Sequence, residues 1–218
     1  SGTVNSAIPG QLDIELRAID RRRVSVFDFT GTGISQGVDA DPENYEISTG
    51  DLPTVPGDAI GQPIVVYGFP NDFGTAPPDF EGRTLVDFSG VRSALEVRWG
   101  IEGTTAPFLM LDSSGLLLDN QNQDIGHRSH IKQGPTAIDL TTLDSATLIA
   151  PRESGPRLFT IKTAGTVQLY NDFENFLTVL TEKLNNVNAV RSLYVRGHYD
   201  RNTNIFSANK ILIHLKEL

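Results

Sequence analysis

The chain has 218 residues, 39% of them hydrophobic and 21% charged, which is enough apolar material for a packed core and too little charge for a disordered chain. It contains no cysteine, which excludes disulfides, thiolate metal sites and cysteine nucleophiles, and no apolar run approaches the ~20 residues of a transmembrane segment. The net charge of −9 repels phosphate backbones, so we expect no nucleic acid as a partner.

The first hundred residues predict short β-strands separated by proline and glycine. Alternating or β-forming runs indicate strands over 11–19, 22–30, 44–48, 63–69 and 84–89. The basic run Arg21-Arg22-Arg23 lies between the first two of these and is interpreted as a solvated hairpin turn. Seven prolines between residues 42 and 78 exclude a long helix here.

The second half begins near Ser93 and predicts further strands and one helix. The segment 112–115, Asp-Ser-Ser-Gly, separates two apolar runs and predicts a hairpin turn. Strands are expected over 146–150, 157–162, 166–170, 191–199 and 205–215. The apolar stripe of Phe173, Phe176, Leu177, Leu180 and Leu184 predicts an α-helix over 172–185, with Asn171 as its N-cap.

Two hairpins, one in each half, match position by position. The matched residues, first copy before second, are Gly68 and Gly197, Phe80 and Phe206, and Gly82 and Ala208. A glycine inside a strand indicates a bend or a close backbone neighbour. In the second copy, the alternation of apolar and polar residues shifts by one position near Asn209-Lys210, which predicts a β-bulge. Bulges and strand glycines curve a sheet into a barrel.

The order of elements predicts a mainly β protein made of two tandem OB-like five-stranded β-barrels. The first module would span residues 3–91 and the second, enlarged by insertions, residues 92–218. In the second, the strand 166–170 would be followed by the helix 172–185 and the last two strands, which is the order of the end of an OB-fold. In the first module the loop 49–62 would replace the helix.

The matched hairpins carry a resemblance to a known group of domains. Its residues are Val66, Gly68, Phe80, Gly82 and Leu85 in the first copy and Val195, Gly197, Phe206, Ala208, Ile211 and Ile213 in the second. This pattern is similar to the small tandem OB-like β-barrel domains of uncharacterised bacterial envelope proteins and lipoproteins. The resemblance implies an exported, non-enzymatic module in the periplasm or at the cell surface, and it brings no functional residues with it.

The beginning of the chain bears on this location. Ser1-Gly2 is interpreted as a remnant of expression rather than as part of the fold. A signal peptide or a lipid-modified cysteine before Thr3, acting as a lipid anchor, would fit an envelope protein, and we expect its presence or absence to decide the location.

The strongest candidate ligand-binding residues lie on the second-last strand of each module. Tyr194, Arg196 and His198 alternate with apolar residues and so share one face of the strand, and Tyr67 and Phe69 take equivalent places in the first copy. OB-folds bind ligands with aromatic and basic groups on the face of strands two and three, whereas these residues lie on strand four. The same residues would also fit a solvent-exposed face or an interface between the modules.

Two patterns are compatible with catalysis or metal binding. His127 and His130 have H-x-x-H spacing in a polar loop near Asp119 and Asp124, which could hold a zinc ion. Ser35 lies in Gly-Ile-Ser-Gln-Gly, which matches a nucleophile elbow, although no helix is predicted after it. Both patterns also fit exposed loops.

Because no catalytic constellation stands out, we expect a non-catalytic envelope protein without a cofactor. Its partner would be an unknown small molecule, a glycan or another protein, or its role would be structural. The alternatives are a hydrolase that uses Ser35 or a His127/His130 metal site, and an OB-type binder of single-stranded nucleic acid, which the net charge disfavours.

Overall fold

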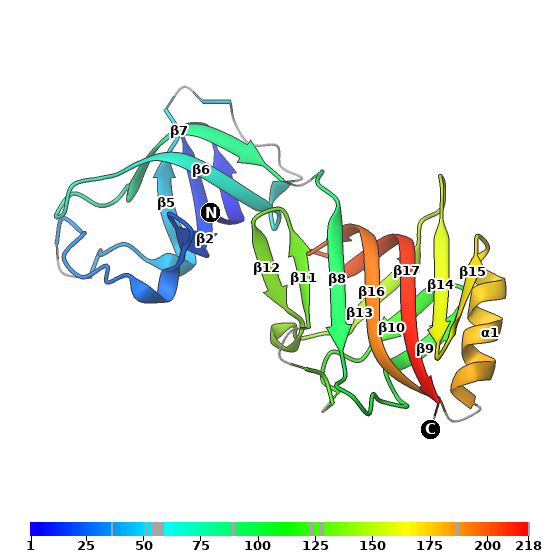
Figure 1. Ribbon diagram of the computed structural model, residues 1–218. Helices are drawn as coiled ribbons and strands as arrows, with labels where there is room; N and C mark the ends of the chain where they lie inside the picture. The colour runs from blue at the N-terminus through cyan, green and yellow to red at the C-terminus, as the bar shows by residue number, and fades with distance from the viewer. Residues whose placement is uncertain are drawn as a thin grey trace. The chain divides into compact units, whose positions relative to one another are not determined.

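The computed structural model describes residues 1–35, 37–50, 52–53, 59–88, 90–122, 124–126, 129–185 and 188–217. In these residues the protein is mainly β, and its contacts divide it into two compact units (Figure 1). Unit 1 contains Ser1–Val91 and Gly134–Thr136, and unit 2 contains Arg92–Gln133 and Ala137–Leu218. The mainly β class predicted from the sequence is confirmed.

Unit 1 is a closed five-stranded barrel with the strand order β1-β2-β5-β7-β6. The strands are β1 (Gly2–Ile8), β2 (Gln11–Leu16), β5 (Tyr45–Ser48), β6 (Pro63–Pro70) and β7 (Phe80–Asp87). Neighbours are antiparallel except β5 and β7, which run parallel. The alternation in β2 buries Leu12, Ile14 and Leu16 inside the barrel, as the sequence predicts.

Two predictions for unit 1 are wrong. The strand predicted over 22–30 is instead the two-residue β4 (Arg22–Arg23), which pairs with β3 (Ala18–Ile19), followed by a 3-10 helix, Val24–Val26. The turn between β3 and β4 falls on Asp20 and Arg21, with φ of 46° and 64°. The predicted basic turn is therefore confirmed at Arg21 alone, because Arg22 and Arg23 are exposed residues of β4. The strand β1 was not predicted, because its residues do not alternate. Gly2 was set aside from the fold, which is incorrect, because it is the first residue of β1.

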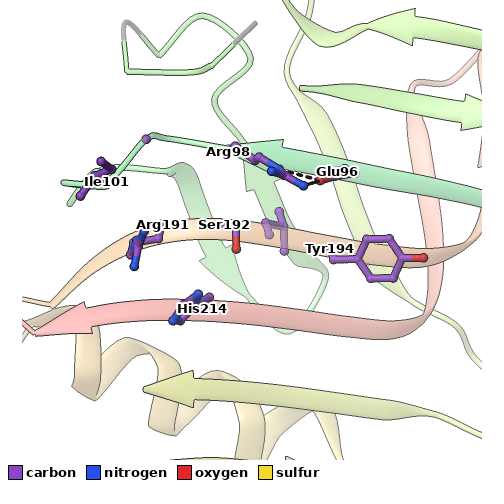
Figure 2. A pocket seen from close by; sticks show the side chains of 9 residues that line it. Glu96, Arg98, Ile101, Arg191, Ser192, Tyr194 and His214 are labelled. Atoms are coloured by element: carbon purple, nitrogen blue, oxygen red, sulfur yellow. Dashed lines mark hydrogen bonds and ion pairs between the residues drawn. The ribbon is translucent and has the colours of Figure 1, made fainter. Parts of the chain in front are cut away.

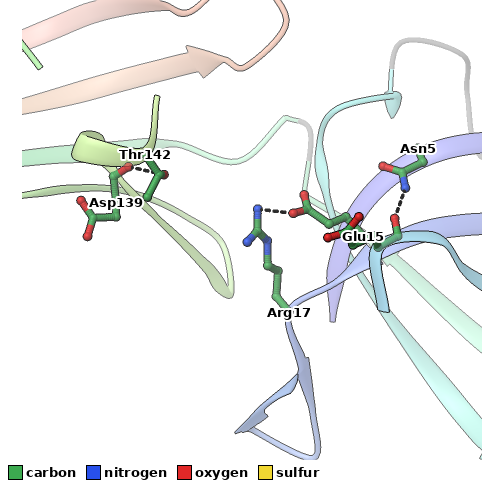
Figure 3. Close-up of polar contacts among 6 residues, drawn as sticks. Asn5, Glu15, Arg17, Asp139 and Thr142 are labelled. Carbon is green, nitrogen blue, oxygen red and sulfur yellow. Dashed lines mark hydrogen bonds and ion pairs between the residues drawn. The ribbon is translucent and has the colours of Figure 1, made fainter. Parts of the chain in front are cut away.

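The irregularity in β1 is a bulge at Asn5. The register with β2 passes from Val4 to Ser6, which leaves Asn5 as the extra residue. Its side-chain Nδ2 donates to the carbonyl of Glu43 at 2.8 Å, and this joins the bulge to the 3-10 helix Pro42–Asn44 (Figure 3). A polar side chain thus holds the barrel wall where the strand pairing is interrupted.

Unit 2 is built around a ten-stranded sheet. Its path is β12-β11-β8-β16-β17-β13-β10-β9, and β14 pairs with both β17 and β15. The strands are β8 (Ser93–Arg98), β9 (Phe108–Asp112), β10 (Gly115–Leu118), β11 (His130–Gln133), β12 (Thr136–Asp139), β13 (Thr147–Pro151), β14 (Leu158–Thr163), β15 (Thr166–Tyr170), β16 (Asn188–Asp200) and β17 (Ile205–Glu217). The predicted hairpin turn joins β9 to β10. A 3-10 helix, Leu140–Thr142, follows β12 and is held in part by a hydrogen bond from Thr142 to the Asp139 carbonyl (Figure 3).

The predicted helix is present as α1 (Phe173–Asn185), and it buries Phe173, Phe176 and Leu180. The cap differs from the prediction, because the carboxylate of Asp172, and not Asn171, accepts the backbone N–H of Asn175 at 2.9 Å. The predicted role of strand 166–170 is wrong. This strand is β15, which pairs with β14, while β13 and β14 are the strands parallel to β17.

The two units share one set of strand pairings. In unit 1, β6 and β7 form an antiparallel hairpin, β7 runs parallel to β5, and β5 is antiparallel to β2. In unit 2, β16 and β17 form the antiparallel hairpin, β17 runs parallel to β13, and β13 is antiparallel to β10. Phe80 lies opposite Ile47, and Phe206 lies opposite Ile149.

The matched glycines explain why the hairpins look alike in sequence. The register shifts immediately before Gly68 and before Gly197, and the second shift leaves Asn209 unpaired, so the predicted bulge is confirmed. A Cβ built on either glycine would lie 1.9 Å from a carbonyl oxygen of the neighbouring strand, that of Glu81 or of Ser207. Only glycine fits this close approach.

The units differ in their first strand. β1 is continuous and pairs with both β2 and β6. In unit 2, β8 pairs with β16 and β9 pairs with β10, and residues 99–107 join β8 to β9. The register of β9 skips Leu109, as that of β1 skips Asn5. β8 and β9 therefore act as the two halves of one interrupted strand.

The stability of unit 1 should depend on the charge of Asp79. This side chain is 7% exposed and accepts the backbone N–H of Glu46 at 2.8 Å. Burial, and then the charges of Glu46, Asp41 and Asp13, raise the pKa of Asp79 above its ordinary value of 3.8. Because the folded chain holds the proton of Asp79 more tightly than the unfolded chain does, protonation of Asp79 stabilises the fold. This contribution is fully present below pH 3.8 and is lost as the pH rises through the raised pKa.

We therefore expect Asp79→Asn, which keeps the acceptor and removes the buried charge, to unfold at higher urea concentration than the parent chain at pH 7. The advantage should shrink as the pH falls towards 3.8. Asp28→Asn is the control, because hydrogen bonds from Thr30 lower the pKa of Asp28 and predict no gain at pH 7. Equal urea midpoints for Asp79→Asn and the parent chain at pH 7 would contradict this account.

Candidate functional site

A hollow of about 350 Å³ lies on the outer face of the unit 2 sheet (Figure 2). It is formed by β8, β16 and β17 together with the segment that follows β8. The residues that line it are Glu96, Arg98, Gly100, Ile101, Arg191, Ser192, Leu193, Tyr194 and His214. Figure 2 shows that the labelled side chains come from adjacent strands and gather on one side of the sheet.

Strand alternation places these side chains. Leu95 and Val97 are fully buried. Side chains alternate along a strand, so Glu96, which lies between them, and Arg98, which follows Val97, face outward. The register then aligns Arg98, Ser192, His214 and Lys162 in one row across β8, β16, β17 and β14. Polar and basic groups far apart in the sequence therefore lie side by side.

Tyr194 and Arg196 form a pre-arranged pair beside the hollow. The Nε of Arg196 donates to the Tyr194 hydroxyl at 2.6 Å, and the guanidinium carbon lies 5.7 Å from the centre of the Tyr194 ring. This contact holds the aromatic ring and a positive charge in one orientation. An aromatic face next to a guanidinium suits a ligand with a planar or ring surface and an anionic group.

His214 adds a titratable group to the hollow. Burial, and then the positive charges of Lys162 and Arg191, lower the pKa of His214 below its ordinary value of 6.5. The imidazole is therefore neutral at pH 7 and can accept or donate one hydrogen bond. An anion bound nearby would offset the positive charges and raise this pKa.

The outer face of this sheet is basic in a chain that is acidic overall. Residues 1–91 carry 14 acidic and 5 basic residues, whereas residues 92–218 carry 13 of each. We call the outer surface of strands β11, β8, β16, β17 and β14 the basic face. Its basic residues are Arg98, Lys132, Lys162, Arg191, Arg196, Lys210 and Lys216. Glu96 and Glu102 form ion pairs with Arg98 and Lys216.

The structure places the candidate ligand-binding residues on two separate units. In unit 2, Arg196 and His198 are exposed and Tyr194 is half-buried, on the same face of β16. In unit 1, Tyr67 and Phe69 are 60% and 67% exposed on β6. Of the five, the described contacts bring together Tyr194 and Arg196.

The candidate catalytic and metal residues lie in other places. Ser35 is exposed in the loop before the 3-10 helix Pro42–Asn44, and its carbonyl accepts from Val38 at 3.2 Å. His130 begins β11, while His127 lies outside the described residues. Within the part of the chain that the structure describes, no group of three His, Cys, Asp or Glu side chains is arranged to hold a metal ion.

Sequence reasoning missed Arg98, Arg191 and His214. Arg98 alternates with buried residues, a pattern that marks an outward side chain, but alternation alone does not show which strands are neighbours. His214 lies in the last strand of the matched hairpin, opposite Ser192. The β16–β8 pairing, which joins residues 94 to 104 positions apart, was the missing information.

Comparison with protein-family models, with curated proteins and with solved structures finds no match to this chain. Among the described residues, no helix has both the length and the apolar character needed to cross a membrane. The geometry of the two units is therefore the basis for the functional proposal.

Proposed function

We propose that this chain is a non-catalytic binding protein of the bacterial cell envelope, and that its basic face binds an acidic glycan. The observation that carries the proposal is the Tyr194–Arg196 pair beside a hollow that also contains Arg98, Arg191 and His214. A tyrosine ring can stack on a sugar ring, while guanidinium groups bind carboxylate or phosphate. The basic residues are spread over five neighbouring strands, β11, β8, β16, β17 and β14, and could therefore contact several units of a polymer.

We also propose that both units are OB-like barrels. The support is the strand order of unit 1, first-second-third-fifth-fourth, with the third and fifth strands parallel. Unit 2 repeats these pairings, with β8 and β9 in place of the first strand and α1 between the third and fourth. OB-folds bind oligosaccharides and oligonucleotides on the face of their second and third strands and on adjacent loops. The basic face lies instead on the strands that correspond to the first, fourth and fifth, so the support for a glycan ligand comes from its side chains and not from the fold.

The test uses fluorescence-labelled oligogalacturonate, an acidic oligosaccharide, with a neutral maltooligosaccharide as the matched probe. We expect the intact chain to bind the acidic probe more tightly than the neutral one, with an affinity that falls as salt rises. Arg196→Gln should weaken binding about tenfold, because a charge-assisted hydrogen bond contributes ~1.5 kcal/mol or more. Fluorescence anisotropy measures both effects.

The control variant is Arg83→Gln, which removes an exposed arginine from β7 in unit 1 and breaks only its surface ion pair with Glu81. It should leave binding unchanged. Equal affinity for the acidic and neutral probes, or equal losses in Arg196→Gln and Arg83→Gln, would contradict the proposal. Tighter binding of a single-stranded oligothymidylate than of the acidic glycan would favour the nucleic-acid alternative.

The envelope location rests on the resemblance of the matched hairpins to domains of envelope proteins and lipoproteins. Determining the N-terminal sequence of the natural protein tests it. A signal peptide, with or without a lipid-modified cysteine, is the expected result. A natural N-terminus without an export signal would contradict the location and would leave the binding proposal to be judged by its own test.

A further inference from the structure

A row of four uncharged side chains crosses the basic face. Strand pairing places these residues side by side across β16, β17, β14 and β15, in the order Tyr194, Leu212, Thr160 and Leu169. Neighbouring strands lie ~4.8 Å apart, so the row extends about 14 Å along the sheet. We call it the uncharged row. It begins at the tyrosine ring that contacts Arg196 beside the hollow.

Basic side chains lie on both sides of the uncharged row. The row on one side contains Arg98 and Lys162, and the row on the other side contains Arg196 and Lys210. Glu96 lies opposite Tyr194 on β8, and its charge is paired with that of Arg98 (Figure 2). A ligand that follows the uncharged row therefore meets positive charge on both sides.

The uncharged row ends at a group of exposed apolar side chains. Val167 and Leu169 of β15 are 57% and 66% exposed, and Leu158 of the neighbouring strand β14 is 38% exposed. Packing of the core does not explain the two residues of β15. Gln168 lies opposite the fully buried Ile161, so alternation turns Val167 and Leu169 to the outer face of the sheet.

These apolar groups and the basic groups belong to one continuous surface. Val167 lies opposite Lys162, and Leu158 lies opposite Lys210. Exposed apolar side chains that gather in one place mark a binding surface. The partner that complements this surface has anionic groups and an apolar segment in the same molecule.

We propose that the acidic glycan carries an acyl chain, which lies along the uncharged row from Tyr194 to Leu169. This inference rests on the proposed function, because the basic residues on both sides hold the acidic sugars. The acyl chain leaves water when it covers Leu212 and Leu169, and this burial is favourable. A free polysaccharide leaves the same leucines in contact with water. The ligand class is therefore an acidic glycolipid.

The test compares three fluorescence-labelled probes with the intact chain. They are oligogalacturonate, the same oligosaccharide with a dodecanoyl chain at its reducing end, and a maltooligosaccharide with that chain. All are used below the concentrations at which the acylated probes form micelles. By fluorescence anisotropy, we expect the acylated acidic probe to bind at least tenfold more tightly than the other two, because burial of a few methylene groups gives this gain.

A variant locates the acyl chain on β15. Leu169→Ser removes an exposed apolar side chain without changing the charge, and it should weaken binding of the acylated acidic probe about fivefold. Binding of plain oligogalacturonate should not change. The matched control is Leu109→Ser, which changes a leucine of similar exposure, 62%, on β9, a strand outside the basic face. It should leave the binding of both probes unchanged.

The outcomes separate this inference from the proposed function. If oligogalacturonate binds equally well with and without the acyl chain, the inference is wrong and the proposed function stands. If neither acidic probe binds, both are wrong. Equal losses in Leu169→Ser and Leu109→Ser would place the acyl chain elsewhere and overturn the inference. Tighter binding of phosphatidylglycerol vesicles than of the acylated acidic probe would also overturn it, because the face would then recognise a membrane surface.

Discussion

Gly197→Ala is expected to destabilise unit 2 by about 3 kcal/mol, in the upper range for forced overlap in a packed interior. The added Cβ would lie 1.9 Å from the carbonyl oxygen of Ser207, which is backbone and cannot rotate away. β16 and β17 would have to separate at their bulge. Urea unfolding followed by the fluorescence of Trp99, the single tryptophan and a buried residue of unit 2, measures the loss.

Two other glycines serve as comparisons. Gly68→Ala makes the same overlap with the Glu81 carbonyl and should destabilise unit 1, while the Trp99 signal of unit 2 keeps its midpoint. A Cβ on Gly90 meets nothing within 4 Å, so Gly90→Ala should change stability by less than about 0.5 kcal/mol. A Gly197→Ala chain as stable as Gly90→Ala would show that the close strand approach is not needed.

Phe176→Ala is expected to cost about 3–5 kcal/mol, the usual range for removing a buried phenylalanine. Phe176 is fully buried, and its ring lies 5.4 Å from that of Phe159 and 5.9 Å from that of Phe173. The substitution leaves a cavity between α1 and the sheet. The midpoint of urea unfolding, again followed by Trp99, measures this effect.

The matched control is Thr178→Ala on the exposed side of the same helix. It removes a hydrogen bond to the Glu174 carbonyl but introduces a better helix former, so the two effects nearly cancel. If Phe176→Ala and Thr178→Ala lost comparable amounts of unfolding free energy, α1 would stabilise the fold through its backbone rather than through its apolar face.

The sequence predicted the parts of the fold that depend on local patterns. The stripe from Phe173 to Leu184 specified α1, and the phase slip at Asn209 specified the bulge, because both follow from the spacing of neighbouring residues. The match of Gly68 with Gly197 identified the shared hairpin, since the same backbone contact requires glycine in both units.

The remaining features depend on pairings between distant segments. β1 has no alternation because of the bulge at Asn5, so its sequence does not resemble a strand. β13 and β14 both pair with β17, and a local pattern cannot show which of several strands runs parallel to it. The hollow could not be predicted for the same reason, because Arg98 and His214 become neighbours only through β16.

The candidate ligand-binding residues show the same contrast between local patterns, which the sequence predicts, and contacts that depend on the folded structure. Alternation correctly put Tyr194, Arg196 and His198 on one face of a strand, which is a local property. It could not show that the Arg196 guanidinium contacts the Tyr194 ring, which depends on side-chain orientation.

The interrupted first strand of unit 2 has a consequence for the order of folding. In unit 1, Gly2 pairs with Ile64, and β7 completes the barrel at Asp87. In unit 2, Val97 pairs with Leu193, and β17 must be present before β16, β13 and β14 can all be joined. Contacts between such distant residues slow folding, since a long loop must close before they form. During synthesis at ~5–20 residues per second, unit 1 can therefore complete its barrel while unit 2 still lacks the strand on which its sheet depends.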